Sequence, residues 1–202
     1  SYSGDDEKAV SIYTEYIDIV REKNHSDGSV ALGNRANSYK KLGRTDLALA
    51  DYHASLELQD CPNVRVNLAT TLRQLGSVEE ARGHLHAALE LDPSFGHAYH
   101  ELAILLAKED LQVSLQHSMR AVELAAHEGD LILFLPQLVD SQEKLELHSE
   151  AFQSYRRMLA LNPTSNNVKR WRERIVFHRR ELDEKDRQRS AREHLSERDN
   201  MP

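Results

Sequence analysis

Histidine is the residue type in this sequence that most invites a search for chemistry, because the chain has eleven of them. Imidazole is a common metal ligand and a common general base. The close pairs are His84 with His86 and His97 with His100. On a helix, residues two apart point to different sides, whereas residues three apart share a face. Only His97 and His100 fit a shared metal, and no third ligand accompanies them, so we expect no metal site.

The single cysteine, Cys61, lies beside Pro62 and has no evident base to activate it as a nucleophile. One cysteine also excludes an internal disulfide framework and any multi-cysteine zinc or iron–sulfur site. The sequence contains no glycine-rich phosphate loop, no His-Glu-x-x-His motif and no Gly-x-Ser-x-Gly motif. We therefore expect a protein that is not an enzyme and that needs no cofactor.

The composition favours helices, because 29 % of the residues are charged and only 6 % are aromatic. No apolar stretch is long enough to predict a membrane span. The net charge is −7, with −10 before Thr164 and +3 from Thr164 onward. This balance argues against nucleic acid as a partner. The lone Cys61 fits a reducing compartment, and we expect a cytoplasmic protein.

A repeat of 33 to 37 residues organises the middle of the chain. Its clearest column is a series of small residues at Ala48, Ala81, Ser114 and Ala151. Two more columns keep the same spacing, namely Tyr52, Leu85, Ser118 and Tyr155, and the triplets that begin at Leu56, Leu89, Val122 and Leu159. Several columns in one register indicate stacked copies of a single structural unit.

Each unit predicts two helices separated by a short turn. In the second unit, Leu68, Ala69 and Leu72 form an apolar stripe, and Gly76 ends that helix as a residue that tolerates positive φ. Ser77 and Glu80 have the spacing of a capping box at the start of the next helix. Small side chains are expected where the two helix axes come closest.

These residues resemble the tetratricopeptide repeat family, whose unit is a helix–turn–helix of about 34 residues. The resemblance implies an all-α fold, a right-handed α-solenoid of helix pairs. We expect an N-terminal capping helix or half repeat at 1–28, four helix pairs at 29–163, and a capping helix with a charged extension at 164–202. Val168, Trp171, Ile175, His178 and Leu182 would cover the last repeat.

The third and fourth units depart from the family pattern. The turn at 108–110 lacks glycine, and Glu146 stands where glycine is usual. Pro136 falls inside the expected first helix of the fourth unit, so that helix is expected either to start late or to kink.

The resemblance also implies a binding surface, because the first helices of this family line a concave groove. Amide side chains there can both donate to and accept from an extended peptide backbone. The alternative is that they only solvate the wall of the groove. The residues that we expect to contact a peptide are Asn34, Asn37, Lys41, Asn67, Arg73, His97, His100 and Lys108.

Some members of the family clamp the acidic C-terminal tail of heat-shock chaperones through two asparagines and three cations. Asn37 and Asn67 match the two asparagines. Gly33, His97 and Glu101 stand where the cations belong, and a carboxylate there repels an acidic ligand. We therefore predict no tight binding of such tails.

The sequence favours a non-enzymatic adaptor that holds a peptide or a helix of a partner protein. The alternatives are a co-chaperone with altered tail specificity and the targeting module of a larger enzyme. The C-terminal helix offers a second route to a partner or to self-association, although its alternating charges are typical of a solvated helix.

Overall fold

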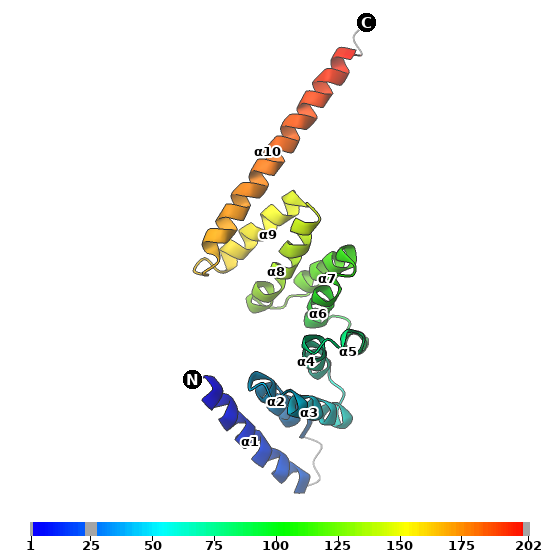
Figure 1. Ribbon diagram of the computed structural model, residues 1–202, viewed down its shortest axis with the longest axis vertical. Helices are drawn as coiled ribbons and strands as arrows, with labels where there is room; N and C mark the ends of the chain where they lie inside the picture. The colour runs from blue at the N-terminus through cyan, green and yellow to red at the C-terminus, as the bar shows by residue number, and fades with distance from the viewer. Residues whose placement is uncertain (1, 23–27, 200–202) are drawn as a thin grey trace. The chain divides into compact units, whose positions relative to one another are not determined.

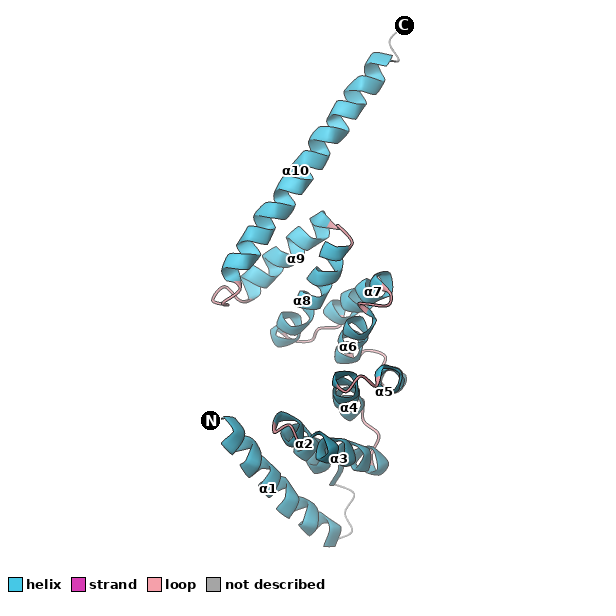
Figure 2. Ribbon diagram, in the orientation of Figure 1, coloured by secondary structure: helices cyan, strands magenta, loops and turns pink. Residues whose placement is uncertain are grey.

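The computed structural model describes residues 2–22 and 28–199, and these residues form ten α-helices and no strand (Figures 1 and 2). Most of these helices pack against the next one along the chain, as in stacked helix pairs. The all-α fold is confirmed, and the longest helix is the C-terminal one. The helices are α1 (Tyr2–Glu22), α2 (Gly28–Lys41), α3 (Thr45–Leu58), α4 (Pro62–Gln74), α5 (Val78–Leu91), α6 (Gly96–Leu106), α7 (Leu111–Glu123), α8 (Glu128–Lys144), α9 (His148–Leu161) and α10 (Val168–Asp199).

The chain divides into two compact units, residues 1–105 and residues 106–202. In the first unit α1 packs on α2, α2 on α3, α3 on α4 and α4 on α5, while α6 adds Ala98, Leu102 and Leu105 to the same apolar core. In the second unit α7 packs on α8, α8 on α9 and α9 on α10. The division into an end helix, four pairs and a capping helix stays a prediction.

The columns of small residues lie where helices meet. Ala48, Ala81, Ser114 and Ala151 each have a relative exposure of 0 %. A side chain larger than these would force the helix axes apart, because packed helices lie only about 8–10 Å from each other. The repeat in the sequence is therefore a repeat of close helix contacts.

Three turns close their helices in the same way. Gly43 and Gly76 have φ values of 73° and 85°, as expected for glycine after a helix, and Glu146 has a φ of 55°. In each turn the next amide donates to a carbonyl five residues earlier, and the three bonds are Arg44 to Tyr39, Ser77 to Leu72 and Leu147 to Gln142. Glu146 thus takes the place of the glycine.

The predicted capping box at Ser77 is wrong, because its side chain makes no capping hydrogen bond. Ser77 closes the preceding helix with its own amide and has a ψ of 65°, not the extended conformation of a capping residue. The turn without glycine is capped instead. The Asp110 carboxylate accepts hydrogen bonds from the amides of Gln112 and Val113, both at 3.0 Å.

Pro136 lies inside α8, which already begins at Glu128. The expected late start of this helix is therefore wrong, and the helix continues through the proline. Because proline has no backbone N–H, the carbonyl of Ile132 loses the donor that an ordinary residue would supply one turn later.

The two end helices each bury one face. Ile17 of α1 is 1 % exposed and packs with Ala31 and Leu32 of α2. Trp171 and Ile175 of α10 pack into the core of the second unit. Residues 183–190 of α10 are exposed, which agrees with the solvated extension expected from their charges.

Candidate functional site

Seven of the eight predicted peptide contacts lie in the first unit, on the helix that opens each pair. Lys108 follows α6 and belongs to the second unit, where it is exposed. The other seven are Asn34, Asn37 and Lys41 on α2, Asn67 and Arg73 on α4, and His97 and His100 on α6. We call the surface formed by α2, α4 and α6 the first-helix face.

A charged cluster joins the three helices of this face. Arg73 of α4 donates through Nε to a carboxylate oxygen of Glu101 of α6 at 3.2 Å. Their side chains are only 28 % and 15 % exposed. We group Lys40 of α2 with this pair because both charges act on it: Glu101 raises its pKa and Arg73 lowers it. Burial outweighs both and leaves the pKa of Lys40 below its ordinary value.

Lys40 was absent from the predicted contacts. Its position one turn after Asn37 was the available signal, since residues three apart share a helix face. Its interaction with α4 and α6 depends on how the helices stack, and the sequence alone does not specify that stacking.

Asn37 is held in one orientation by the core. The hydroxyl of Tyr52 donates to Asn37 Oδ1 at 2.6 Å. Tyr52 is 0 % exposed, and burial raises its pKa to about 12, so it stays a donor. With its oxygen engaged in this way, Asn37 has its two N–H donors left for other acceptors. Asn67 is half-buried on α4.

Asn34 lies at the edge of an apolar hollow between α1 and α2. The hollow has a volume of about 260 Å³, and Ile12, Tyr13 and Tyr16 of α1 form one wall. Val30 and Ala31 of α2 lie opposite. The hollow was not predicted, because it exists only where α1 packs on α2.

The remaining predicted contacts differ in how accessible they are. His100 is 7 % exposed, and burial lowers its pKa to about 4, with further lowering from His97 and Arg73. His97 is half-buried, with its ring 5.6 Å from that of Phe95. Lys41 is exposed and lies 3.5 Å from a carboxylate oxygen of Asp6.

No set of three or more His, Cys, Asp or Glu side chains is placed to hold a metal ion within residues 2–22 and 28–199. None of the helices described is both long and apolar enough to cross a membrane. Cys61 is half-buried and is not in a disulfide.

Comparison with known proteins places these repeats in a family. Residues 34–95 match the model of the tetratricopeptide repeat family. The chain is 36 % identical to sperm-associated antigen 1 of Mus musculus over 94 residues, and this aligned segment covers 46 % of the chain. The match spans only 10 % of the length of that protein.

Solved structures share the fold at low sequence identity. BtubC from P. vanneervenii has a TM-score of 0.69 at 22 % identity, covering 79 % of this chain and 74 % of its own. The first tetratricopeptide domain of Spaghetti (RPAP3), solved with the HSP90 peptide SRMEEVD, has a TM-score of 0.53 at 21 % identity. It covers 60 % of this chain and 95 % of its own. The family match covers residues 34–95, and the repeated helix pairs with their buried small residues are what this chain shares with tetratricopeptide repeat proteins.

Proposed function

We propose that the chain is a non-enzymatic adaptor that binds an extended segment of a partner protein on the first-helix face of its first unit. Tetratricopeptide domains are in general protein–protein interaction modules, and the solved relatives include one bound to a peptide. The observation that carries the proposal is the oriented amide of Asn37 beside the cluster of Lys40, Arg73 and Glu101.

Asn37 and Asn67 are the proposed backbone contacts. Asn37 presents N–H donors that suit the carbonyl groups of an extended peptide, because Tyr52 already engages its oxygen. A receptor with donors held in place loses little side-chain freedom on binding, which favours affinity. Asn34 lies on the same helix as Asn37 and borders the hollow between α1 and α2. We propose that this hollow takes an apolar side chain of the same segment.

The charged cluster sets the proposed preference for ligand charge. Lys40 and Arg73 supply two cations, and Glu101 supplies one carboxylate that already engages Arg73. One excess positive charge suits a segment with a single acidic group. A tail with several carboxylates would meet Glu101 as a repulsive neighbour.

A chaperone-tail receptor is the second candidate, because the Spaghetti domain binds the HSP90 peptide SRMEEVD. In this chain the place of one clamp cation is Gly33, where an added Cβ would lie 3.3 Å from Val64 Cγ2. The place of another is Glu101, which pairs with Arg73. Both features oppose the binding of such a tail.

Affinity capture from cell extract tests the adaptor proposal. We expect Asn37→Ala/Asn67→Ala to reduce the recovery of specific partner proteins about tenfold, because two neutral hydrogen bonds contribute about 1–3 kcal/mol. The matched control is Gln59→Ala/Gln116→Ala, which removes two exposed amides elsewhere. Equal recovery by the wild-type chain and the asparagine double variant would contradict the proposal.

Titration calorimetry with the peptide SRMEEVD separates the two candidates. We expect weak binding by the wild-type chain and a gain of at least about tenfold in His97→Lys/Glu101→Arg, which restores two cations. Micromolar binding by the wild-type chain that Asn37→Ala abolishes would favour the chaperone-tail receptor instead.

The third candidate, a targeting module within a larger enzyme, is compatible with the small share of sperm-associated antigen 1 that the match covers. The full-length gene product would decide it directly. Association through α10 is a separate possibility, and deletion of residues 183–202 in the same capture experiment would detect it.

A further inference from the structure

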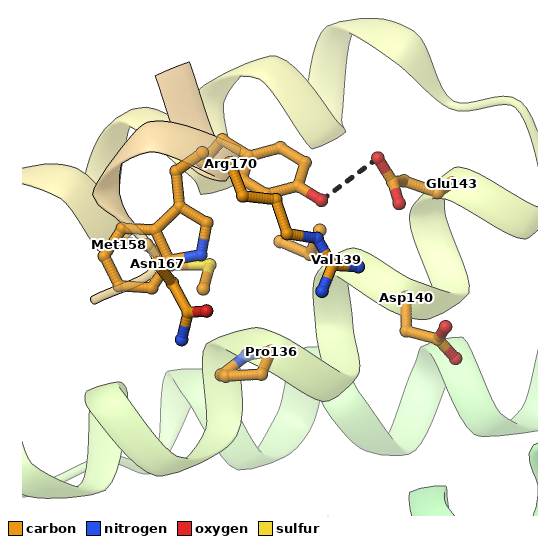
Figure 3. Close-up of a pocket in the computed structure, with 9 residues that line it drawn as sticks. Pro136, Val139, Asp140, Glu143, Met158, Asn167 and Arg170 are labelled. Carbon is orange, nitrogen blue, oxygen red and sulfur yellow. Dashed lines mark hydrogen bonds between the residues drawn. The ribbon is translucent and has the colours of Figure 1, made fainter. Parts of the chain in front are cut away.

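Two adjoining hollows lie in the second unit where α8, α9 and α10 meet, and Figure 3 shows the residues that line the larger one. Their volumes are about 190 Å³ and about 150 Å³. Pro136, Met158, Asn167 and Trp171 line both of them, so the two hollows form one continuous surface. None of the predicted peptide contacts belongs to it.

The lining combines an apolar floor with polar groups on the α10 side. Val139 and Tyr155 line the larger hollow, and Ile132 and Leu161 line the smaller one. Asn167 and Arg170 stand on one side of the larger hollow, and Pro136 and Asp140 stand on the other (Figure 3). The lining thus offers a ligand both apolar contact and hydrogen-bonding groups.

Glu143, also in the lining, is already satisfied. Its Oε1 accepts from Arg174 Nε at 2.5 Å and from the Tyr155 hydroxyl at 3.1 Å, and it lies 3.0 Å from His178 Nε2. On the far side of the His178 ring, Nδ1 lies 3.1 Å from Nδ1 of His148. Arg174 and Glu143 therefore neutralise each other and anchor α10 to α8.

Arg170 is different. It is exposed at the edge of the larger hollow and forms no ion pair within the described part of the chain. Asp140, across the hollow, is engaged by Lys144 at 2.7 Å. Arg170 and the side-chain amide of Asn167 are thus donors that a ligand on the floor can reach, and a carboxylate is a group that they suit.

The backbone of α8 offers one more polar group. Pro136 leaves the carbonyl of Ile132 without its usual helical donor, and both residues line the smaller hollow. A peptide N–H is the natural donor to such a carbonyl, since backbone carbonyl groups are strong hydrogen-bond acceptors.

The size of the hollows points to side chains of a larger ligand. Each is smaller than the roughly 300–1,000 Å³ of a typical small-molecule pocket. Peptide recognition commonly combines main-chain hydrogen bonds with shallow pockets for individual side chains. We propose that this surface is a second peptide site, which takes an extended segment that carries an apolar side chain next to an aspartate or a glutamate.

Trp171 makes the proposal directly testable, because it is the only tryptophan in the chain and lines both hollows. A phage-displayed library of random short peptides is selected on the Asn37→Ala/Asn67→Ala variant, in which the first-unit surface is disabled. Enriched peptides are then synthesised and titrated while the emission of Trp171 is followed. We expect an enriched pattern of an apolar residue beside an acidic one, with a saturable change in emission.

Variants of two neighbouring arginines define the site. Arg170→Glu should weaken binding of the selected peptides at least about tenfold, since it removes a charge-assisted donor and places a carboxylate beside the acidic residue of the peptide. Arg172→Glu makes the same charge change at an exposed position of α10 outside the lining and should leave the affinity unchanged. Pro136→Ala, which returns a donor to the Ile132 carbonyl, should also weaken binding.

Three results would overturn the proposal. They are a selection that enriches no peptide, peptides that bind without changing the emission of Trp171, and equal binding by the wild-type chain and Arg170→Glu. These results do not test the adaptor proposal, because the selection uses a chain that lacks Asn37 and Asn67.

Discussion

Histidine shows at the residue scale how burial, and not residue type, decides chemical behaviour. His100 is 7 % exposed with a pKa of about 4, and His178 is 1 % exposed with a pKa below its ordinary value. Burial is the main cause in both cases, because it disfavours the charged ring. His178 also contacts Glu143, which partly opposes that shift. Both rings are neutral parts of a helix core near neutral pH.

His100 makes the stability of the first unit depend on pH. Its pKa is lower in the folded chain than the 6.5 of an unperturbed histidine, so the unfolded chain binds the proton more tightly. Its contribution to stability is complete above pH 6.5 and is lost as the pH falls toward about 4. At about pH 5 the loss is about 2 kcal/mol relative to pH 7.

Urea unfolding followed by circular dichroism at about pH 7 and about pH 5 measures this effect. We expect His100→Gln to lose about 2 kcal/mol less between the two pH values than the wild-type chain. His86→Gln is the control, because His86 is exposed on the neighbouring helix. An unchanged pH dependence in His100→Gln would show that the ring does not carry it.

At the scale of helices and turns, different residues form the same turn at the end of a helix. Gly43, Gly76 and Glu146 all have left-handed backbone conformations. In each turn the amide of the next residue donates a hydrogen bond to the carbonyl five residues earlier. Glycine adopts this conformation without strain, whereas an L-residue with a Cβ is disfavoured by about 1–2 kcal/mol. The fourth repeat therefore retains the shape of the family turn without its usual residue.

Glu146→Gly should stabilise the second unit. We expect an increase of about 0.5–1 kcal/mol in the free energy of unfolding, after allowance for the greater freedom of glycine in the unfolded chain. Gly76→Ala is the mirror experiment and should destabilise the first unit by a similar amount, since its φ is 85° and its neighbourhood is open. Chemical denaturation of both variants measures the changes, and destabilisation by Glu146→Gly would refute this account.

The whole molecule consists of two compact units, each with its own apolar core. In repeat proteins, stability is approximately a sum over repeats and the contacts between neighbours. A cavity in one core should therefore act mainly on the unit that contains it. Trp171 packs against the core of the second unit and reports its unfolding.

Two matched cavity variants test this separation. Leu68 is 0 % exposed in the first unit, and Leu135 is 1 % exposed in the second. Each change to alanine should destabilise its own unit by about 3 kcal/mol. We expect Leu135→Ala to lower the unfolding midpoint reported by Trp171 emission much more than Leu68→Ala does. Equal shifts in that midpoint would mean that the chain unfolds as one cooperative body.

The sequence by itself determined the helix pairs. Small residues at Ala48 and Ala81 and glycine at Gly43 and Gly76 are requirements of local geometry, so their spacing predicts where helices cross and end. The apolar spacing from Val168 onward likewise predicted which face of α10 is covered, because helical periodicity fixes which side chains share a face.

Only the tertiary structure decided which of these residues meet. The contact between Arg73 and Glu101, the effect of both on Lys40, and the hold of Tyr52 on Asn37 each join different helices. The hollows beside Asn34 and Trp171 likewise depend on how neighbouring helices pack. Periodicity gives the face on which a side chain lies, whereas its distance to a side chain on another helix depends on the crossing of the two axes, which the packing of the whole core determines.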